Sequence, residues 1–170
     1  SNLPLDKTLD VITEQAAPLL GSDANAIYRL DSQSNMLVIE TSQGMPDDNL
    51  VTADIPPGKN ALRKAIRERK PQTIEDVATA RGSLTSEEKA DEIPEYLGKQ
   101  YRSLLAVPIV IRDKAFGGMV LYYREPRAFS EEDIALAMSF SDHVSLAIEN
   151  ARLLAAAEAS AVVAERNRLA

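Results

Sequence analysis

The 170-residue sequence contains no cysteine and no tryptophan, and only one histidine. Without thiols the chain forms no disulfide, binds no metal through thiolate, and offers neither a cysteine nucleophile nor a thioether link for a bilin. The absence of cysteine also fits a protein from a reducing compartment. We therefore expect a cytoplasmic protein without a thioether-linked chromophore.

Long apolar runs and an excess of basic residues are missing as well. No apolar run approaches the roughly 18 residues that a membrane span requires, so we expect no direct membrane contact from this segment. The formal net charge of −7 argues against general binding to nucleic acid or to anionic lipid. Apolar residues make up 45% and charged residues 26% of the chain, which is typical of a globular domain.

Motifs for catalysis and for metal binding are equally scarce. The sequence contains no Gly-x-Ser-x-Gly motif for a serine nucleophile. Gly58-Lys59-Asn60 lacks the upstream glycine and the following Ser or Thr of a P-loop. The carboxylate pairs at 47–48 and 87–88 have no third ligand at metal spacing. We therefore assign no catalytic residue and no metal, and we expect a non-enzymatic segment.

The N-terminal half predicts a helix over 5–20 and then a hairpin. A stripe of apolar residues recurs at steps of four and three, as on one face of a helix: Leu5, Leu9, Ile12, Ala16 and Leu19. Two short strand-like runs, 25–30 and 36–42, are joined by a polar turn. A short helix over 59–69 and a brief strand over 72–74 follow.

The C-terminal half predicts two longer strands over 103–111 and 115–123, separated by the charged step Arg112-Asp113-Lys114. Because proline donates no ladder hydrogen bond, the first strand is either bulged at Pro108 or open on one side there. Gly117-Gly118 permits close backbone approach near the start of the second strand.

A very long helix is predicted from Ser130 to about Arg166, because this stretch contains neither proline nor glycine. Roughly 37 residues would give a rod of about 55 Å. Positions seven apart follow one face of the rod, as in a parallel coiled coil: Ile134, Ser141, Ile148, Ala155, Val162 and Leu169. We therefore expect a homodimer formed through the terminal helices.

The order of these elements resembles that of a GAF domain. The segments that carry the resemblance are ANAIYRLD (24–31), Gly44, SLLAVP (103–108), GGMVLY (117–122), FSEED (129–133) and AIENA (147–151). The resemblance implies an α+β fold with a central antiparallel sheet of five to six strands. The N- and C-terminal helices would cover one face of the sheet, and an irregular lid (75–102) with short helices would cover the other. Residues 1–155 would form the sensor domain, and 156–170 would form a signalling helix that leads toward an output domain.

Small ligands of GAF domains bind between the sheet and the lid, so the resemblance also implies a pocket. The candidate pocket residues are Ala26, Tyr28, Ser42, Gln43, Lys59, Tyr96 and Tyr101. Packing of the core and the hairpin by these same residues is the alternative. The Asn-Lys-x-Phe-Asp pattern of the members that bind cyclic nucleotides is absent, and the ligand or cofactor is left unknown. We interpret the lone histidine, His143, as a structural or solvent-facing residue rather than as a haem ligand.

The last seven residues, AERNRLA (164–170), resemble the approach to the phosphoacceptor helix of one class of histidine kinase. The resemblance implies a sensory module that precedes a kinase domain in the same polypeptide, with an unknown small-molecule ligand. An ordinary charged helix end is the alternative interpretation of these residues. Two other functions stay open: a dimerisation spacer without a ligand, and the input domain of a transcriptional regulator or a cyclic-dinucleotide enzyme.

Overall fold

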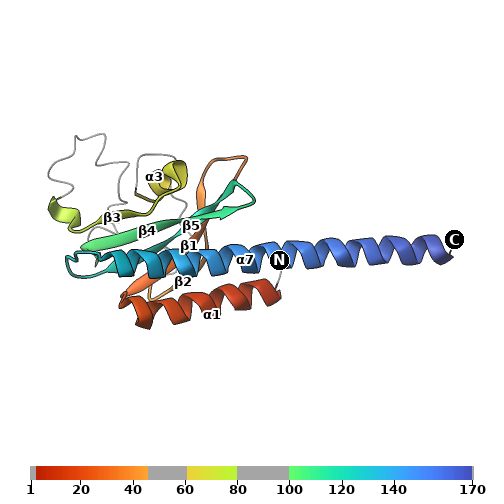
Figure 1. Cartoon of the computed structure of the whole chain (residues 1–170), viewed down its shortest axis with the longest axis horizontal. Helices are drawn as coiled ribbons and strands as arrows, with labels where there is room; N and C mark the ends of the chain where they lie inside the picture. Colours follow the sequence, from red (N-terminus) through yellow and green to blue (C-terminus); the bar gives the residue numbers. More distant parts are fainter. Residues whose placement is uncertain (1–2, 46–60, 80–99, 170) are drawn as a thin grey trace.

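The computed structural model describes residues 3–45, 61–79 and 100–169. Within these ranges the chain forms α1 (Leu3–Leu20), β1 (Ala24–Leu30), β2 (Leu37–Gln43), α3 (Ala61–Glu68), β3 (Gln72–Ile74), β4 (Ser103–Ile111), β5 (Lys114–Tyr123) and α7 (Glu131–Leu169). The five strands form one antiparallel sheet in the order β2-β1-β5-β4-β3. Helices α1 and α7 lie on one face of the sheet and α3 lies on the other (Figure 1). This arrangement confirms the predicted α+β fold.

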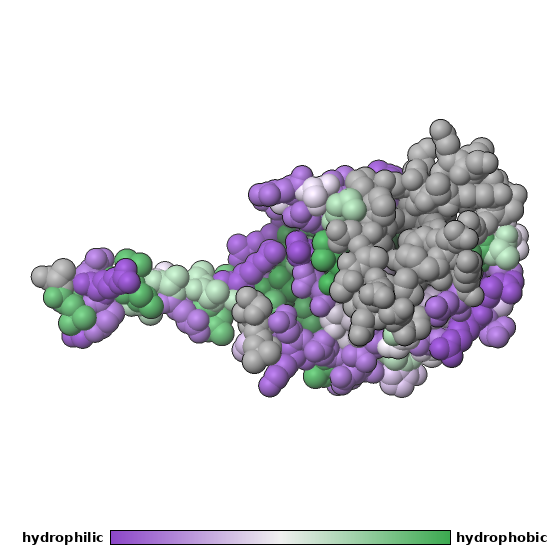
Figure 2. Space-filling model, turned by 180° about the vertical axis from the view of Figure 1, so that it is seen from behind, coloured by the Kyte–Doolittle hydropathy of each residue, from purple (hydrophilic) through white to green (hydrophobic). Residues whose placement is uncertain are grey.

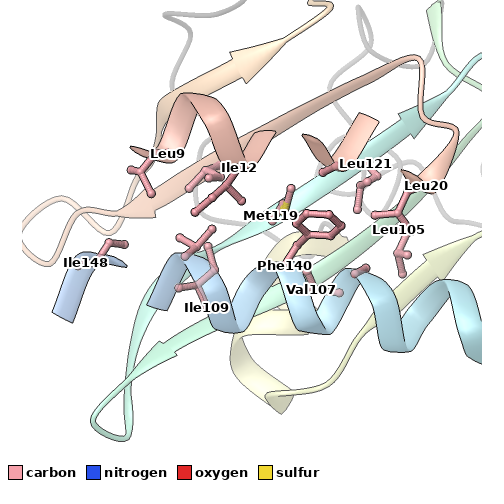
Figure 3. Packing of buried hydrophobic residues seen from close by; sticks show 14 of the residues in the cluster. Leu9, Ile12, Leu20, Leu105, Val107, Ile109, Met119, Leu121, Phe140 and Ile148 are labelled. Atoms are coloured by element: carbon pink, nitrogen blue, oxygen red, sulfur yellow. The ribbon is translucent and has the colours of Figure 1, made fainter. Parts of the chain in front are cut away.

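The sheet separates two apolar cores. On the α1/α7 face, side chains from both helices meet those of β4 and β5 (Figure 3). On the opposite face, which we call the α3 face, α3 contributes four buried residues, Ala61, Leu62, Ala65 and Ile66. Because both faces of the sheet are covered, β4 and β5 are almost continuously buried, which explains why both read as unbroken apolar runs.

Helix α1 packs through the stripe that the sequence predicts, with one change at its end. Leu9, Ile12 and Ala16 are buried, whereas Leu19 is 64% exposed and Leu20 is buried in its place. The helix continues through Pro18 to Leu20, so the last inward position comes four residues after Ala16, as the helical repeat requires.

Side-chain hydrogen bonds connect both terminal helices to the sheet. The Asn25 amide of β1 donates to the Thr13 carbonyl of α1 over 3.0 Å. The Ser141 hydroxyl of α7 donates to the carbonyl of Pro108. In the described strands, β3 pairs with β4 only at residues 104–106, so β4 is open at Pro108 on the side away from β5. The strand is therefore open on one side at Pro108, and it is not bulged at that residue, because Pro108 pairs regularly with Gly118.

The residues of α7 that are spaced seven apart pack against the domain in the first part of the helix and are exposed in the second part. Ile134 packs against the core of the α1/α7 face, and Ser141 and Ile148 are buried there. Ala155, Val162 and Leu169 are exposed. Ile134 and Ile148 therefore contact the core of their own chain, because this side of α7 covers the apolar surface of the sheet. Their role in a dimer stays a prediction.

The buried phenol of Tyr123 makes stability depend on pH. Its hydroxyl donates to the Leu20 carbonyl over 2.8 Å, and burial raises the pKa of Tyr123 to about 12. A pKa raised by folding favours the protonated form, so its contribution is complete below the unfolded pKa near 10 and is lost as pH rises toward 12. We expect the free energy of unfolding to fall by about 2 to 3 kcal/mol over that range because of this group.

Urea unfolding of the wild type and of Tyr123→Phe between pH 9 and pH 12 tests this expectation. The variant lacks the titrating group, so its free energy of unfolding should fall less steeply above pH 10. Parallel profiles for the two proteins would contradict the assignment to Tyr123.

Candidate functional site

Three tyrosines meet on the α3 face of the sheet. Tyr28 of β1 and Tyr122 of β5 point to the same face, and their hydroxyl oxygens lie 2.6 Å apart. Tyr101, which lies two residues before the start of β4, places its ring centroid 5.1 Å from that of Tyr122 with the planes tilted by 32°. We call Tyr28, Tyr101 and Tyr122 the tyrosine cluster. It is a polar group of side chains within an otherwise apolar core.

The hydroxyl of Tyr101 is the unusual atom of this cluster. It is buried, and among the described residues it has no hydrogen-bond partner. Burial raises the pKa of Tyr101, so the group stays a neutral phenol that can both donate and accept. A buried hydroxyl without a partner costs about 1 to 3 kcal/mol. A bound molecule that supplied the missing hydrogen bond would therefore gain affinity at this position.

A family model for GAF domains matches residues 2–149. The chain belongs to the GAF domain family. GAF domains are in general sensory or regulatory modules without catalytic activity, and the arrangement of two terminal helices behind a five-stranded antiparallel sheet agrees with that family.

Solved GAF domains share this fold at low sequence identity. The GAF domain of an Acinetobacter phosphoenolpyruvate-protein phosphotransferase is 21% identical with a TM-score of 0.73, covering 90% of this chain and 87% of that one. The Thermosynechococcus elongatus PixJ GAF domain, in its blue-light absorbing form, is 22% identical with a TM-score of 0.74 and covers 92% of each chain. A domain of a Sinorhizobium meliloti 1021 protein described as a two-component sensor histidine kinase is 19% identical with a TM-score of 0.72, covering 93% and 99%.

The structure brings only some of the candidate pocket residues of this GAF domain together. Ala26 is fully buried on the α3 face beside Tyr28. Ser42 pairs with Ala26 across the β1–β2 ladder, so it shares that face at the edge of the sheet. Gln43 pairs with Asn25, whose side chain bonds to α1, so Gln43 belongs to the opposite face. Lys59 and Tyr96 lie outside the described residues.

Tyr122 was missed by the sequence reasoning, although a signal for it was present. It stands two residues after Val120 in β5, and both side chains are buried in the core of the α3 face. Strand alternation along the predicted run 115–123 would have placed Tyr122 on one face with Val120. Alternation along one strand does not show that Tyr122 lies beside Tyr28. These residues are 94 positions apart in the sequence and meet because β1 pairs with β5.

His143 lies away from the tyrosine cluster. It is exposed on α7, with its ring centroid 6.3 Å from that of Phe140, and therefore on the helix side of the sheet. In the ranges that the structure describes, no three His, Asp or Glu side chains gather closely enough to hold a metal ion. None of the helices described here combines the length and the apolar character needed to cross a membrane.

Proposed function

We propose that this GAF domain is the cytoplasmic sensory module of a two-component histidine kinase. A small molecule or a partner that binds on the α3 face would change the arrangement of two paired α7 helices and so the geometry of the kinase. The observation that carries this proposal is the continuity of α7, a single helix of 39 residues. Its first part supplies Ala137, Val144 and Ile148 to the core, and from Arg152 onward its described residues are exposed.

This continuity supports a mechanical role because a helix packed on a sheet moves with it. Any shift of β4 or β5 is passed to α7 through the core contacts and through the hydrogen bond from Ser141 to Pro108. Binding changes the output only if the ligand has different affinities for the two arrangements of the helices. The similar Sinorhizobium meliloti domain, described as part of a sensor histidine kinase, supports the same class of output.

A second copy of the chain is the proposed partner of the projecting segment, residues 152–169. Most helical stability in proteins comes from the packing of an apolar face rather than from intrinsic propensity, and the apolar side chains of this segment are visible in Figure 2. Among them Leu153 is 50% and Val162 is 55% exposed. Leu146, seven residues before Leu153, is 57% exposed on the body of the domain.

The face that carries Leu146 and Leu153 is the better candidate for the seam between two copies. Leu146 precedes Ile148 by two residues, about 200° around the helix, so it points away from the sheet that Ile148 covers. A parallel seam that continues from the projecting segment onto the body of the domain requires a face that is free along both. Only a face turned away from the sheet meets that condition.

The tyrosine cluster is the proposed contact for the small molecule, and a thermal-shift screen with nucleotides and small metabolites tests it. A ligand present at about 100 times its Kd should stabilise the folded protein by about 2.7 kcal/mol. Tyr101→Phe should unfold no more readily than the wild type, since its hydroxyl has no partner in the described structure. The variant should nevertheless bind the ligand about five- to tenfold more weakly, since one hydrogen bond is lost.

Tyr123→Phe is the matched control, because the hydroxyl of Tyr123 is bonded to Leu20 on the other face. Its affinity for the ligand should equal that of the wild type. A screen without any stabilising compound would favour the dimerisation spacer instead. Acid-labile phosphate on the full-length protein after incubation with ATP would support the kinase, whereas its absence would favour a transcriptional regulator or a cyclic-dinucleotide enzyme.

A further inference from the structure

A hollow of about 460 Å³ lies at the end of the sheet where α7 leaves the domain. Both hairpin turns, between β1 and β2 and between β4 and β5, lie at the end toward which α7 projects (Figure 1). The residues that line the hollow come from these strand ends and from the first exposed turn of α7: Arg29, Leu30, Asp31, Ser32, Ile111, Arg112, Lys114, Ala115, Phe116 and Arg152.

Positive charge is concentrated around this hollow, although the chain as a whole carries a net charge of −7. Four of the lining residues are basic and one, Asp31, is acidic. The side chain of Arg29 pairs with Glu40 and lies 4.0 Å from Asp31. The side chain of Arg112 pairs with Glu149 of α7 over 2.9 Å.

Lys114 and Arg152 have no such compensation. Neither side chain makes an ion pair with the residues that the structure describes. The guanidinium of Arg152 lies 6.0 Å from the centroid of the Phe116 ring. The hollow thus offers two cations that make no ion pair within the described part of the chain, beside an aromatic ring, which is a favourable setting for an anion that carries an apolar group.

A β-bulge in β5 directs the side chain of Phe116 toward the hollow. In the β4–β5 ladder Ile109 pairs with Gly117 and Val110 pairs with Ala115, so Phe116 has no partner. Regular alternation would place Phe116 on the α3 face, since Val120 and Tyr122 of the same parity lie there. The bulge turns it to the α1/α7 face, where it packs against the core beneath α7. Bulges that redirect one side chain are frequent beside binding sites.

The adjoining turn holds an arginine in an unfavourable backbone conformation. Arg112 and Asp113 have φ values of 49° and 64° and form a two-residue turn between Ile111 and Lys114. Turns of this kind prefer Asn or Gly, because both central residues adopt positive φ. Strain of this sort tends to persist where a side chain is needed for function. Here it places Arg112 between Glu149 and the hollow.

We propose that the hollow binds a small organic phosphate. The phosphate group lies between Lys114 and Arg152 within reach of Arg112, and the organic part lies against Phe116 and Leu30. A volume of about 460 Å³ is in the range of known small-molecule sites. The site is separate from the tyrosine cluster, so this proposal does not depend on whether a ligand binds there. A bound phosphate would join the β4–β5 turn to the first exposed turn of α7.

Calorimetric titration with phenyl phosphate tests this site, because the probe combines a dianion with an aryl group. We expect saturable binding by the wild type and weaker binding of inorganic phosphate, which lacks the ring. The double variant Lys114→Gln/Arg152→Gln should bind phenyl phosphate at least about tenfold more weakly, since two charged hydrogen bonds are lost.

The double variant Lys64→Gln/Arg166→Gln is the matched control, since it removes one lysine and one arginine at exposed positions away from the hollow. It should bind as the wild type does. Equal weakening in both double variants, or no binding of phenyl phosphate by the wild type at millimolar concentration, would overturn the proposal. Sedimentation with vesicles that contain phosphatidic acid separates a soluble ligand from a lipid headgroup, and binding to the vesicles alone would also overturn it.

Discussion

Gly117→Ala is expected to lower the free energy of unfolding by about 3 kcal/mol, at the upper end of the usual cost of overpacking. A Cβ at position 117 would stand 1.9 Å from the carbonyl oxygen of Tyr28 and 2.8 Å from its carbonyl carbon. These are backbone atoms of β1, paired directly with β5, so no side-chain rotation relieves the contact. The two strands would have to separate at the centre of the sheet.

Gly21→Ala is the matched control, measured by urea unfolding under the same conditions. Gly21 directly follows α1 and has a φ of +64°, and among the described residues a Cβ there would meet only Arg127, at 3.7 Å. Its expected cost is about 1 to 2 kcal/mol, from the left-handed conformation alone. Gly117→Ala should therefore destabilise the protein more than Gly21→Ala does. The reverse order would show that β1 and β5 can move apart without great cost.

Leu153→Lys is expected to convert the proposed dimer into a monomer, so the mass found by light scattering should fall by half. Leu153 shares the outward face of α7 with Leu146, and a lysine there would place a charge in an apolar seam without a partner. Because Leu153 is half exposed in the single chain, the thermal stability of the domain itself should change little.

Val162→Lys is the matched variant on the opposite face of the same helix. Val162 lies nine residues beyond Leu153, about half a turn around the axis, and it belongs to the stripe that runs back to the buried Ile148. It should stay a dimer. A monomer from Val162→Lys and a dimer from Leu153→Lys would move the seam to the stripe of Ala155, Val162 and Leu169. A monomeric wild type would remove the dimer altogether.

Much of the fold could be predicted because local patterns in this chain agree with the tertiary structure. The short helix α3, the brief strand β3 and the hairpin of β4 and β5 all follow from periodicity and turn residues. The close approach at Gly117 and Gly118 follows from the same kind of reasoning. A Cβ on Gly118 would stand 2.3 Å from Leu62.

The candidate site was predicted less well. Alternation shows which residues of one strand share a face, but it does not show which residues of another strand lie beside them. Tyr28 and Tyr101 were named, yet their common neighbour Tyr122 was not. Ser42 and Gln43 are both candidate pocket residues, yet consecutive residues of a strand point to opposite faces, and only Ser42 shares the α3 face. The bulges at Phe116 and opposite Tyr28 also shift parity within a strand. Pro108 and Gly117 beside the first bulge favour an irregularity in that region, but they do not give the residue at which the parity changes.

The sequence by itself determined the class of fold, the family and the long terminal helix, because each of these depends on patterns within one segment and on their order along the chain. The tertiary structure alone decided which face of α7 is free. Seven-residue spacing marks an apolar stripe but does not say whether a sheet or a second helix covers it. In this chain the sheet covers Ile148, and only the face turned away from the sheet is left along the whole helix.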